Sequence, residues 1–244
     1  MKDPTLKLAR WLVMLAAMLG CAGCVTATKP NLFTSSKEEV RSRVKVIALN
    51  RMSADTGISV TEQQRKDFEA YVTDELTRAG FRVVPAAVTQ NIGRQESERI
   101  GGAFDPVTGQ ANPDKIKQLQ EFTYKELAAK QQVDAVLFTR LMVVKATFTS
   151  PWAHWDGVDE NCETTDFGTR FLSGIHTGTM PALSFVVTLS DMNKATLYGN
   201  RGGLQLLAKV FGQNQFVDVP KKDLLVDPKV NQNAVKLAIS PLGP

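Results

Sequence analysis

The side chains with the greatest chemical potential gather in one segment, residues 150–181. Both histidines of the chain, His154 and His176, lie there. The segment also carries carboxylates and a thiol, namely Asp156, Asp159, Glu160, Cys162, Glu163 and Asp166. Such groups could hold Zn²⁺ or Ca²⁺, but their spacing matches no known zinc helix or EF-hand loop. Neither Gly-x-Ser-x-Gly nor His-Glu-x-x-His accompanies them, so the sequence predicts no catalytic site, no metal and no cofactor.

The same segment is rich in large aromatic side chains, which are Trp152, Trp155, Phe167 and Phe171. Residues 150–181 show no clear hydrophobic period, so they are predicted to form a long loop inserted between two strands. In one interpretation the loop is a structural lid whose tryptophans plug the end of a sheet. In the other it is a binding loop, because exposed aromatics beside charges are typical of interaction hot spots. The candidate binding residues are Trp152, His154, Trp155 and Asp156.

The N-terminus carries a targeting signal. Lys2, Lys7 and Arg10 precede or border an apolar run over residues 11–19. This run is shorter than the roughly 20 residues that cross a bilayer, but it has the size expected of a secretory signal peptide. We therefore predict a signal over residues 1–20. An ordinary cleaved signal and an N-terminal membrane anchor remain alternatives.

The cysteine that follows Gly20 suggests a lipid anchor. The stretch ending in Gly20 and Cys21 resembles a bacterial lipobox, and this resemblance implies cleavage before Cys21 and attachment of lipid, including palmitate, to it. Cys24, which also follows a glycine, is the second choice. Residue Ala22 stands where an aspartate would imply retention at the inner membrane, so the resemblance implies sorting to the outer membrane. Residues 21–40 are then a lipidated tether.

The third cysteine leaves one covalent question open. If Cys21 carries the lipid, Cys24 and Cys162 are the two remaining thiols of the chain. They could form a disulfide in the oxidising periplasm. We favour the alternative in which Cys162 is a small buried apolar residue.

Composition places residues 41–244 among ordinary globular domains. The 244-residue chain is 43% hydrophobic and 22% charged, with a formal net charge of +4. No dense basic cluster with interleaved aromatics occurs, so nucleic acid is not an expected partner. No second long apolar run follows the signal, so no transmembrane helix is expected there.

Hydrophobic periodicity and capping signals divide this domain into alternating strands and helices. Strands are predicted over 44–50, 81–84, 133–148, 183–189 and 196–210, and helices over 61–79, 87–100, 112–127 and 223–239. This order predicts an α/β fold in which a mixed β-sheet is flanked by helices in a single periplasmic domain.

Three stretches carry a family resemblance. They are residues 44–84, with a Gly-Phe-Arg-Val-Val turn into a strand, residues 132–138, and the hairpin of residues 183–198. They resemble the periplasmic lipoprotein group that includes the curli secretion channel subunit and the penicillin-binding-protein activator lipoprotein B. The chain departs from that pattern at residues 150–181, and it lacks an apolar amphipathic hairpin pair for building a pore.

These observations together give two functional expectations. The first is a non-enzymatic lipoprotein, anchored through its N-terminal lipid to the outer membrane and facing the periplasm. It would act as an adaptor or accessory in envelope assembly or secretion by binding an envelope protein. The alternative is a small-molecule or glycan-binding lipoprotein that uses the 150–181 segment.

Overall fold

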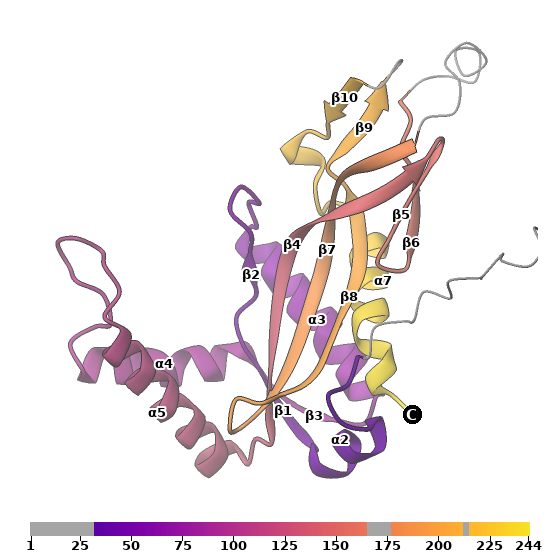
Figure 1. Ribbon diagram of the computed structural model, residues 1–244. Coiled ribbons are helices and arrows are strands. Elements are labelled where there is room, and N and C mark those ends of the chain that lie inside the picture. The colour runs from indigo at the N-terminus through magenta and orange to yellow at the C-terminus, as the bar shows by residue number, and fades with distance from the viewer. Residues whose placement is uncertain (1–31, 165–176, 212–214) are drawn as a thin grey trace, which may run out of the picture. The chain divides into compact units, whose positions relative to one another are not determined.

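A computed structural model describes residues 32–164, 177–211 and 215–244 (Figure 1). In chain order the elements are α2 (Lys37–Arg43), β1 (Val46–Leu49), β2 (Ser53–Ala54), α3 (Glu62–Arg78), β3 (Arg82–Val84), α4 (Ala86–Arg99), α5 (Pro113–Gln131), β4 (Ala135–Thr149), β5 (Trp152–Trp155), β6 (Val158–Asn161), β7 (Thr177–Asp191), β8 (Thr196–Leu206), β9 (Ala208–Phe211), β10 (Gln215–Asp218), η1 (Lys221–Asp223), α7 (Pro228–Ile239) and η2 (Ser240–Leu242). The fold is α/β, with a mixed sheet flanked by helices as predicted. Residues 32–244 form one compact unit.

Strand β4 organises the sheet. One edge of β4 pairs in succession with β1 and β2, both parallel, and then with β5, which is antiparallel. The other edge pairs with β7 over the full length of both strands, from Ala135 with Asp191 to Thr149 with Thr177. Strand β3 extends the parallel side beyond β1, and β8 extends the antiparallel side beyond β7. The sheet is therefore parallel at one side and antiparallel at the other.

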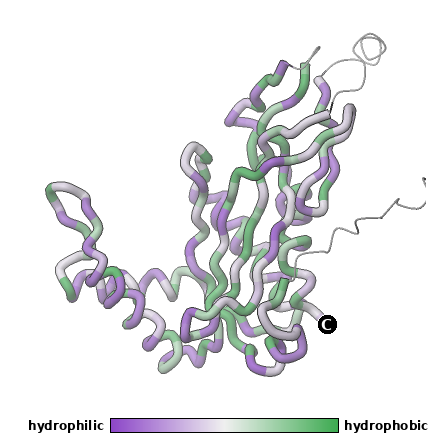
Figure 2. Tube along the Cα trace, in the orientation of Figure 1, coloured by the Kyte–Doolittle hydropathy of each residue, from purple (hydrophilic) through white to green (hydrophobic). Residues whose placement is uncertain are grey.

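Helices cover both faces of the sheet. Because side chains alternate along a strand, β4 sends Leu137 and Leu141 to one face and Val136 and Phe138 to the other. The first face packs against α3 and α7 in the main core. The second face meets Leu127 of α5 in a smaller core. In Figure 2 the strands are green over much of their lower part and paler toward their upper ends, which fits burial of β4 on two faces only near its start.

Local sequence signals explain where the helices begin and end. The Thr61 hydroxyl accepts a hydrogen bond from the Gln64 amide at 3.1 Å, and the Gln64 side chain accepts one from the Thr61 amide at 2.9 Å, so the two residues form a capping box at the start of α3. Gly80 ends α3 with φ of +91°, a conformation that costs glycine little. Asn112 caps α5 ahead of Pro113, as predicted. The closing helix is predicted over 223–239 with a break near Pro228, and the structure has α7 starting at Pro228, because Asp227 caps a new start there.

The 150–181 segment differs from its prediction as a loop. Strand β4 runs on to Thr149, a cis Ser150–Pro151 turn follows, and β5 and β6 form a hairpin paired with the end of β4. Strand β7 begins at Thr177, earlier than the predicted 183. The reason is that β5 and β6 have only four residues each, and β5 places Trp152 on the exposed face and Ala153 on the buried one, so hydrophobicity does not follow burial. Phe167, Phe171, Asp166 and His176 lie outside the described residues.

The β5–β6 hairpin encloses a second small core. Trp155 and Cys162 pack there with Phe148 and Leu206. The hairpin is tied to β8 by the Gly203 amide, which donates to the Asp156 carbonyl at 2.9 Å. Cys162 is buried, as favoured from the sequence. Cys24, its possible disulfide partner, lies outside the described residues.

Two further features complete the fold. Strands β9 and β10 form a separate antiparallel pair. The sequence predicted a strand only up to residue 210, so β10 was not predicted. No helix in the described part of the chain is long and apolar enough to cross a membrane.

Candidate functional site

The predicted binding residues of the 150–181 segment divide between two sides of the β5–β6 hairpin. Trp152 and His154 point to solvent, and Trp152 is 48% exposed. Trp155 points inward, is 7% exposed, and donates its indole N–H to the Leu183 carbonyl at 3.2 Å. Asp156 lies in the hairpin turn with φ of +38°, and its carboxylate accepts a hydrogen bond from the Ser184 hydroxyl at 2.7 Å. The structure therefore brings Trp152 and His154 together and gives Trp155 and Asp156 structural contacts.

Trp152 and His154 belong to a wider exposed surface, which we call the tip face. Residues paired across neighbouring strands project to the same side of a sheet. The register places two rows across β7, β4, β5 and β6. The rows are Thr177, Thr149, Trp152 and Asn161, and Thr179, Thr147, His154 and Asp159.

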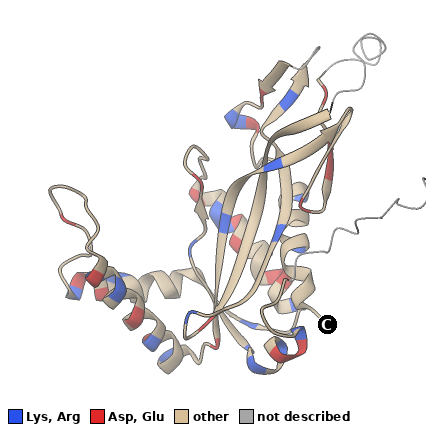
Figure 3. Ribbon diagram, in the orientation of Figure 1, with Lys and Arg blue, Asp and Glu red and all other residues tan. Residues whose placement is uncertain are grey.

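The tip face combines one aromatic surface with many hydrogen-bonding groups. All its residues are exposed except Asn161, which is half-buried. His154 Nδ1 lies 2.5 Å from Asp159 Oδ1, so the imidazole is oriented by the carboxylate. In Figure 3 the ends of β4 and β7 carry few charges compared with the helices. The face is therefore exposed, mainly uncharged and rich in hydroxyls, which suits contact with an extended polar molecule.

Metal binding gains no support in this region. Among the described residues no group of three or more histidine, cysteine, aspartate or glutamate side chains converges on a point. His154 and Asp159 form a pair without a third such ligand in the described ranges. Zinc sites in proteins use three or four protein ligands.

A second candidate region lies where the parallel strands end. After Leu49 of β1 the chain leads to α3 on one face of the sheet, and after Val84 of β3 it leads directly to α4 on the other. Connections that diverge in this way leave a crevice at the carboxyl ends of the strands, which is the usual ligand position in open α/β sheets. Asn50 and Gln90 border cavities on both sides of this crevice.

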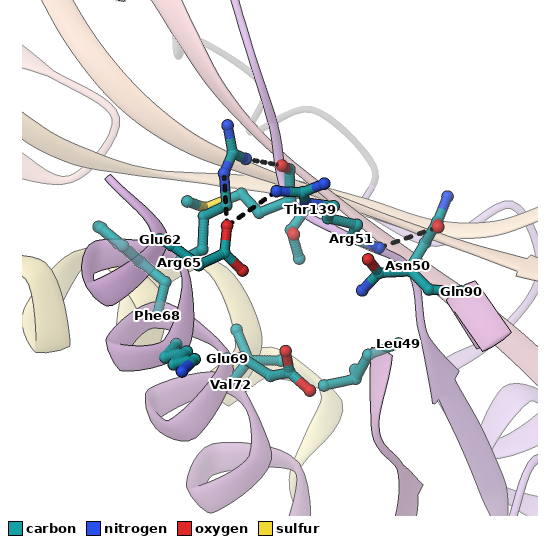
Figure 4. Close-up of a pocket in the computed structure, with 12 residues that line it drawn as sticks. Leu49, Asn50, Arg51, Glu62, Arg65, Phe68, Glu69, Val72, Gln90 and Thr139 are labelled. Carbon is teal, nitrogen blue, oxygen red and sulfur yellow. Dashed lines mark hydrogen bonds and ion pairs between the residues drawn. The ribbon is translucent and has the colours of Figure 1, made fainter. Parts of the chain in front are cut away.

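The cavity on the α3 side is small and held by its own charges (Figure 4). Its volume of about 30 Å³ leaves room for a few water molecules at most. The Glu62 carboxylate lies 2.8 Å from Nη2 of Arg51 and 3.9 Å from Nε of Arg65, and Arg65 also donates to the Met52 carbonyl. Glu69 accepts a hydrogen bond from the Ala86 amide at 2.9 Å. Arg51, Glu62 and Arg65 are therefore engaged with one another, and Glu69 is engaged with the backbone. These contacts indicate a structural ion-pair network on the α3 side.

The cavity on the α4–α5 side is large enough for a ligand. Its volume of about 410 Å³ falls within the usual range for small-molecule sites. Lys194 lies at its edge, with Nζ 5.8 Å from the centre of the Tyr124 ring. Burial, followed by the charge of Asp191, raises the pKa of Tyr124 above its usual value, so the phenol stays protonated at neutral pH. The lining is Asn50, Thr89, Gln90, Gly93, Leu119, Gln120, Thr123, Tyr124, Leu127, Val136, Phe138, Ser190 and Lys194.

Sequence reasoning did not find this cavity. The spacing of apolar residues in α5 predicts an inner stripe of Ile116, Leu119, Thr123 and Leu127. Of the residues of α5 only Leu127 is buried. The sequence did contain an indication of the cavity. Helix α5 has 19 residues and carries a threonine on its apolar stripe, which gives it too little bulk to fill the space beside the sheet.

Comparison with known proteins gives weak structural likeness only. No protein-family model matches the chain, and no curated protein matches it. A PelC dodecamer from Paraburkholderia phytofirmans is 13% identical, with a TM-score of 0.37, and the match covers 83% of this chain and 91% of that one. A Helicobacter pylori protein described as a neuraminyllactose-binding hemagglutinin homolog is 11% identical with a TM-score of 0.31, covering 80% and 81%. At these values the likeness carries no conclusion about function, and the resemblance stated from the sequence stays a prediction.

Proposed function

We propose that this chain is a lipid-anchored, non-catalytic protein of the bacterial envelope that binds a glycan chain on the tip face. The observation that carries the proposal is the pair of exposed rows across β7, β4, β5 and β6. They place a half-exposed indole, Trp152, among hydroxyl, amide, imidazole and carboxylate groups.

The chemistry of these rows matches that of a sugar chain. A pyranose ring has faces covered by C–H groups, which stack on an aromatic ring, and edges that carry hydroxyls. Trp152 offers the aromatic ring. The side chains of Thr149, His154, Asp159 and Asn161 offer donors and acceptors around it. Neighbouring strands lie about 4.8 Å apart, so a chain lying across them meets polar groups at regular steps.

The lipid anchor rests on the N-terminal sequence. The signal over residues 1–20 and the lipobox-like approach to Cys21, with Cys24 as second choice, support attachment to a membrane. The resemblance named above supports the outer membrane. A glycan-binding domain on such an anchor would hold a polysaccharide or the cell wall close to the membrane.

Glycan binding is tested with purified chain on an array of bacterial polysaccharides and on isolated cell-wall sacculi. We expect retention that Trp152→Ala reduces at least about tenfold, since this variant removes the stacking surface. Phe211→Ala on β9 is the matched control, because Phe211 is equally exposed at 49% but lies outside the tip face. The proposal fails if no glycan is retained, or if the two variants bind alike.

A second candidate function, binding a partner protein, is favoured by the β9–β10 pair. Phe216 and Val217 of β10 are each 50% exposed, and Phe216 contacts Phe148 edge to face. Within the described residues β10 pairs only with β9, so its outer edge offers backbone groups to an added strand. This surface supports the adaptor role expected from the sequence, with an envelope protein as partner.

The adaptor role is tested by placing a photo-crosslinking amino acid at Phe216 in cells. We expect a discrete crosslinked envelope protein that is lost with Val217→Lys and kept with Trp152→Ala. Absence of any discrete product, or its persistence with Val217→Lys, would remove the adaptor role. Because the two surfaces use different residues, each function can fail alone.

A further inference from the structure

We propose that the α4–α5 cavity is a binding site for a small amphipathic anion, a molecule with an apolar body and one acidic group. This site is separate from the tip face and does not depend on the proposed function. It lies between the second face of the sheet and the α4–α5 pair, which Figure 1 shows beside the lower end of the strands.

The walls of the cavity suit an apolar body. Val136 and Phe138 supply one wall from β4, and Leu119, Tyr124 and Leu127 supply the other from α5. The cavity opens to solvent, so a ligand that covers these apolar walls would remove them from water. The facing positions on the helices, Gly93 and Thr123, are too small to fill it. The space is therefore a property of the sequence, since larger residues at these two positions would close it.

One buried polar group in the lining lacks a partner. Thr89 of α4 is 8% exposed, and its Oγ1 makes no hydrogen bond within the described part of the chain. A buried hydroxyl without a partner is costly, and buried polar groups are nearly always paired. Gln90 and Gln120 also border the cavity. A ligand with hydrogen-bonding atoms would supply the missing partner for Thr89.

The positive charge of Lys194 at the edge of the cavity favours an acidic ligand over a basic one. Lys194 is the charged residue among those that line the cavity. It sits in the β7–β8 turn with φ of +69°, and its amide donates to the Asp191 carbonyl at 2.9 Å, so the turn fixes its backbone. Asp191 does not line the cavity, although its negative charge acts on Tyr124, and its carboxylate is held in the turn by the amides of Asn193 and Ala195, each at 2.9 Å. The ammonium of Lys194 is thus the group at the edge that can pair with an anion.

The test uses two fluorescent probes that share an apolar body and differ in charge. One is the sulfonate 8-anilinonaphthalene-1-sulfonate, and the other is the neutral N-phenyl-1-naphthylamine. The protein is the chain from residue 21 with Cys21→Ser and Cys24→Ser, which avoids detergent and keeps the compact unit of residues 32–244 whole. We expect saturable binding of both probes at a single site.

Three variants locate the probe. Gly93→Leu fills the cavity, because a Cβ at Gly93 meets only Thr123 Oγ1 at 3.8 Å and the longer side chain extends into the space. We expect Gly93→Leu to weaken the binding of both probes at least about tenfold, and Gly93→Ala to weaken it less than about threefold. Lys194→Gln should weaken the binding of the sulfonate about three- to tenfold and leave the affinity for the neutral probe unchanged.

Each outcome decides a part of the proposal. The proposal that the cavity is a binding site is refuted if Gly93→Leu leaves the binding of both probes unchanged. It is also refuted if neither probe shows saturable binding. An equal effect of Lys194→Gln on both probes overturns its preference for anions. Circular dichroism of Gly93→Leu confirms that it is folded, and the solvent-side Lys194→Gln gives a test that does not depend on repacking.

Discussion

The two tryptophans of the β5–β6 hairpin should differ sharply in their effect on stability. Trp155 is 7% exposed in the second core, whereas Trp152 on the same strand is 48% exposed. Truncating a buried tryptophan to alanine costs about 3–5 kcal/mol in free energy of unfolding. Loss of the Trp155 hydrogen bond to the Leu183 carbonyl, 3.2 Å long, adds about 1 kcal/mol. We therefore expect Trp155→Ala to lower the free energy of unfolding by about 4–6 kcal/mol and Trp152→Ala by no more than about 1 kcal/mol.

Urea unfolding followed by far-ultraviolet circular dichroism measures both free energies. Equal denaturant slopes for the two variants would show that the comparison reports stability rather than a change in the unfolded state. The second core is a cluster separate from the main core, so Trp155→Ala could also open the hairpin locally. Amide hydrogen exchange in β5 and β6 detects that opening. Costs that are equal for the two variants, together with unchanged exchange, would refute the assignment of Trp155 to the core.

Three further outcomes are expected. Gly202→Ala should lower the free energy of unfolding by more than about 2 kcal/mol, because its Cβ would lie 2.0 Å from the Ala234 carbonyl oxygen of α7. The control in the same urea assay is Gly199→Ala, whose Cβ would lie 3.8 Å from the Val187 carbonyl oxygen. Burial, followed by the charge of Glu163, raises the pKa of Cys162, so the reactive thiolate is scarce; a thiol reagent at pH 8 should label it slowly in the native protein and rapidly in urea. Metabolic labelling with palmitate should disappear with Cys21→Ser and persist with Cys24→Ser; the reverse result would move the lipid to Cys24.

Elements with strong local signals could be predicted from the sequence. The Thr61 capping box, Gly80 and the Asn112–Pro113 start each mark a helix boundary through contacts within a few residues. The long apolar runs that became β4 and β7 were also visible. These features together give the fold class.

The candidate surfaces depend on contacts that are distant in sequence. Trp152 and Trp155 look alike in the sequence, and only the pairing of Trp152 with Thr149 decides which of them faces solvent. The tip face joins Thr147 to Thr179 across 32 positions, and no local pattern predicts that register. In a strand sequence a glycine such as Gly202 favours a bulge. A bulge does occur next to it on β8, but the closer constraint is the backbone of α7, which a strand sequence does not reveal.

The two proposed sites share strand β4 but lie far apart on it. Phe138 borders the α4–α5 cavity, and Thr149 belongs to the tip face. At about 3.3 Å per residue, the eleven steps from 138 to 149 span about 36 Å of strand. Between them β4 pairs with β7 along the whole of one edge, and on the other edge it pairs with β2 at residues 140–141 and with β5 at residues 147–149. A strand held in this way has little freedom to shift, so we expect the ligand of the cavity to leave glycan binding unchanged. Equal glycan retention by Gly93→Leu and the unaltered chain would bear this out, and a large change would require a second arrangement of β4 against β7.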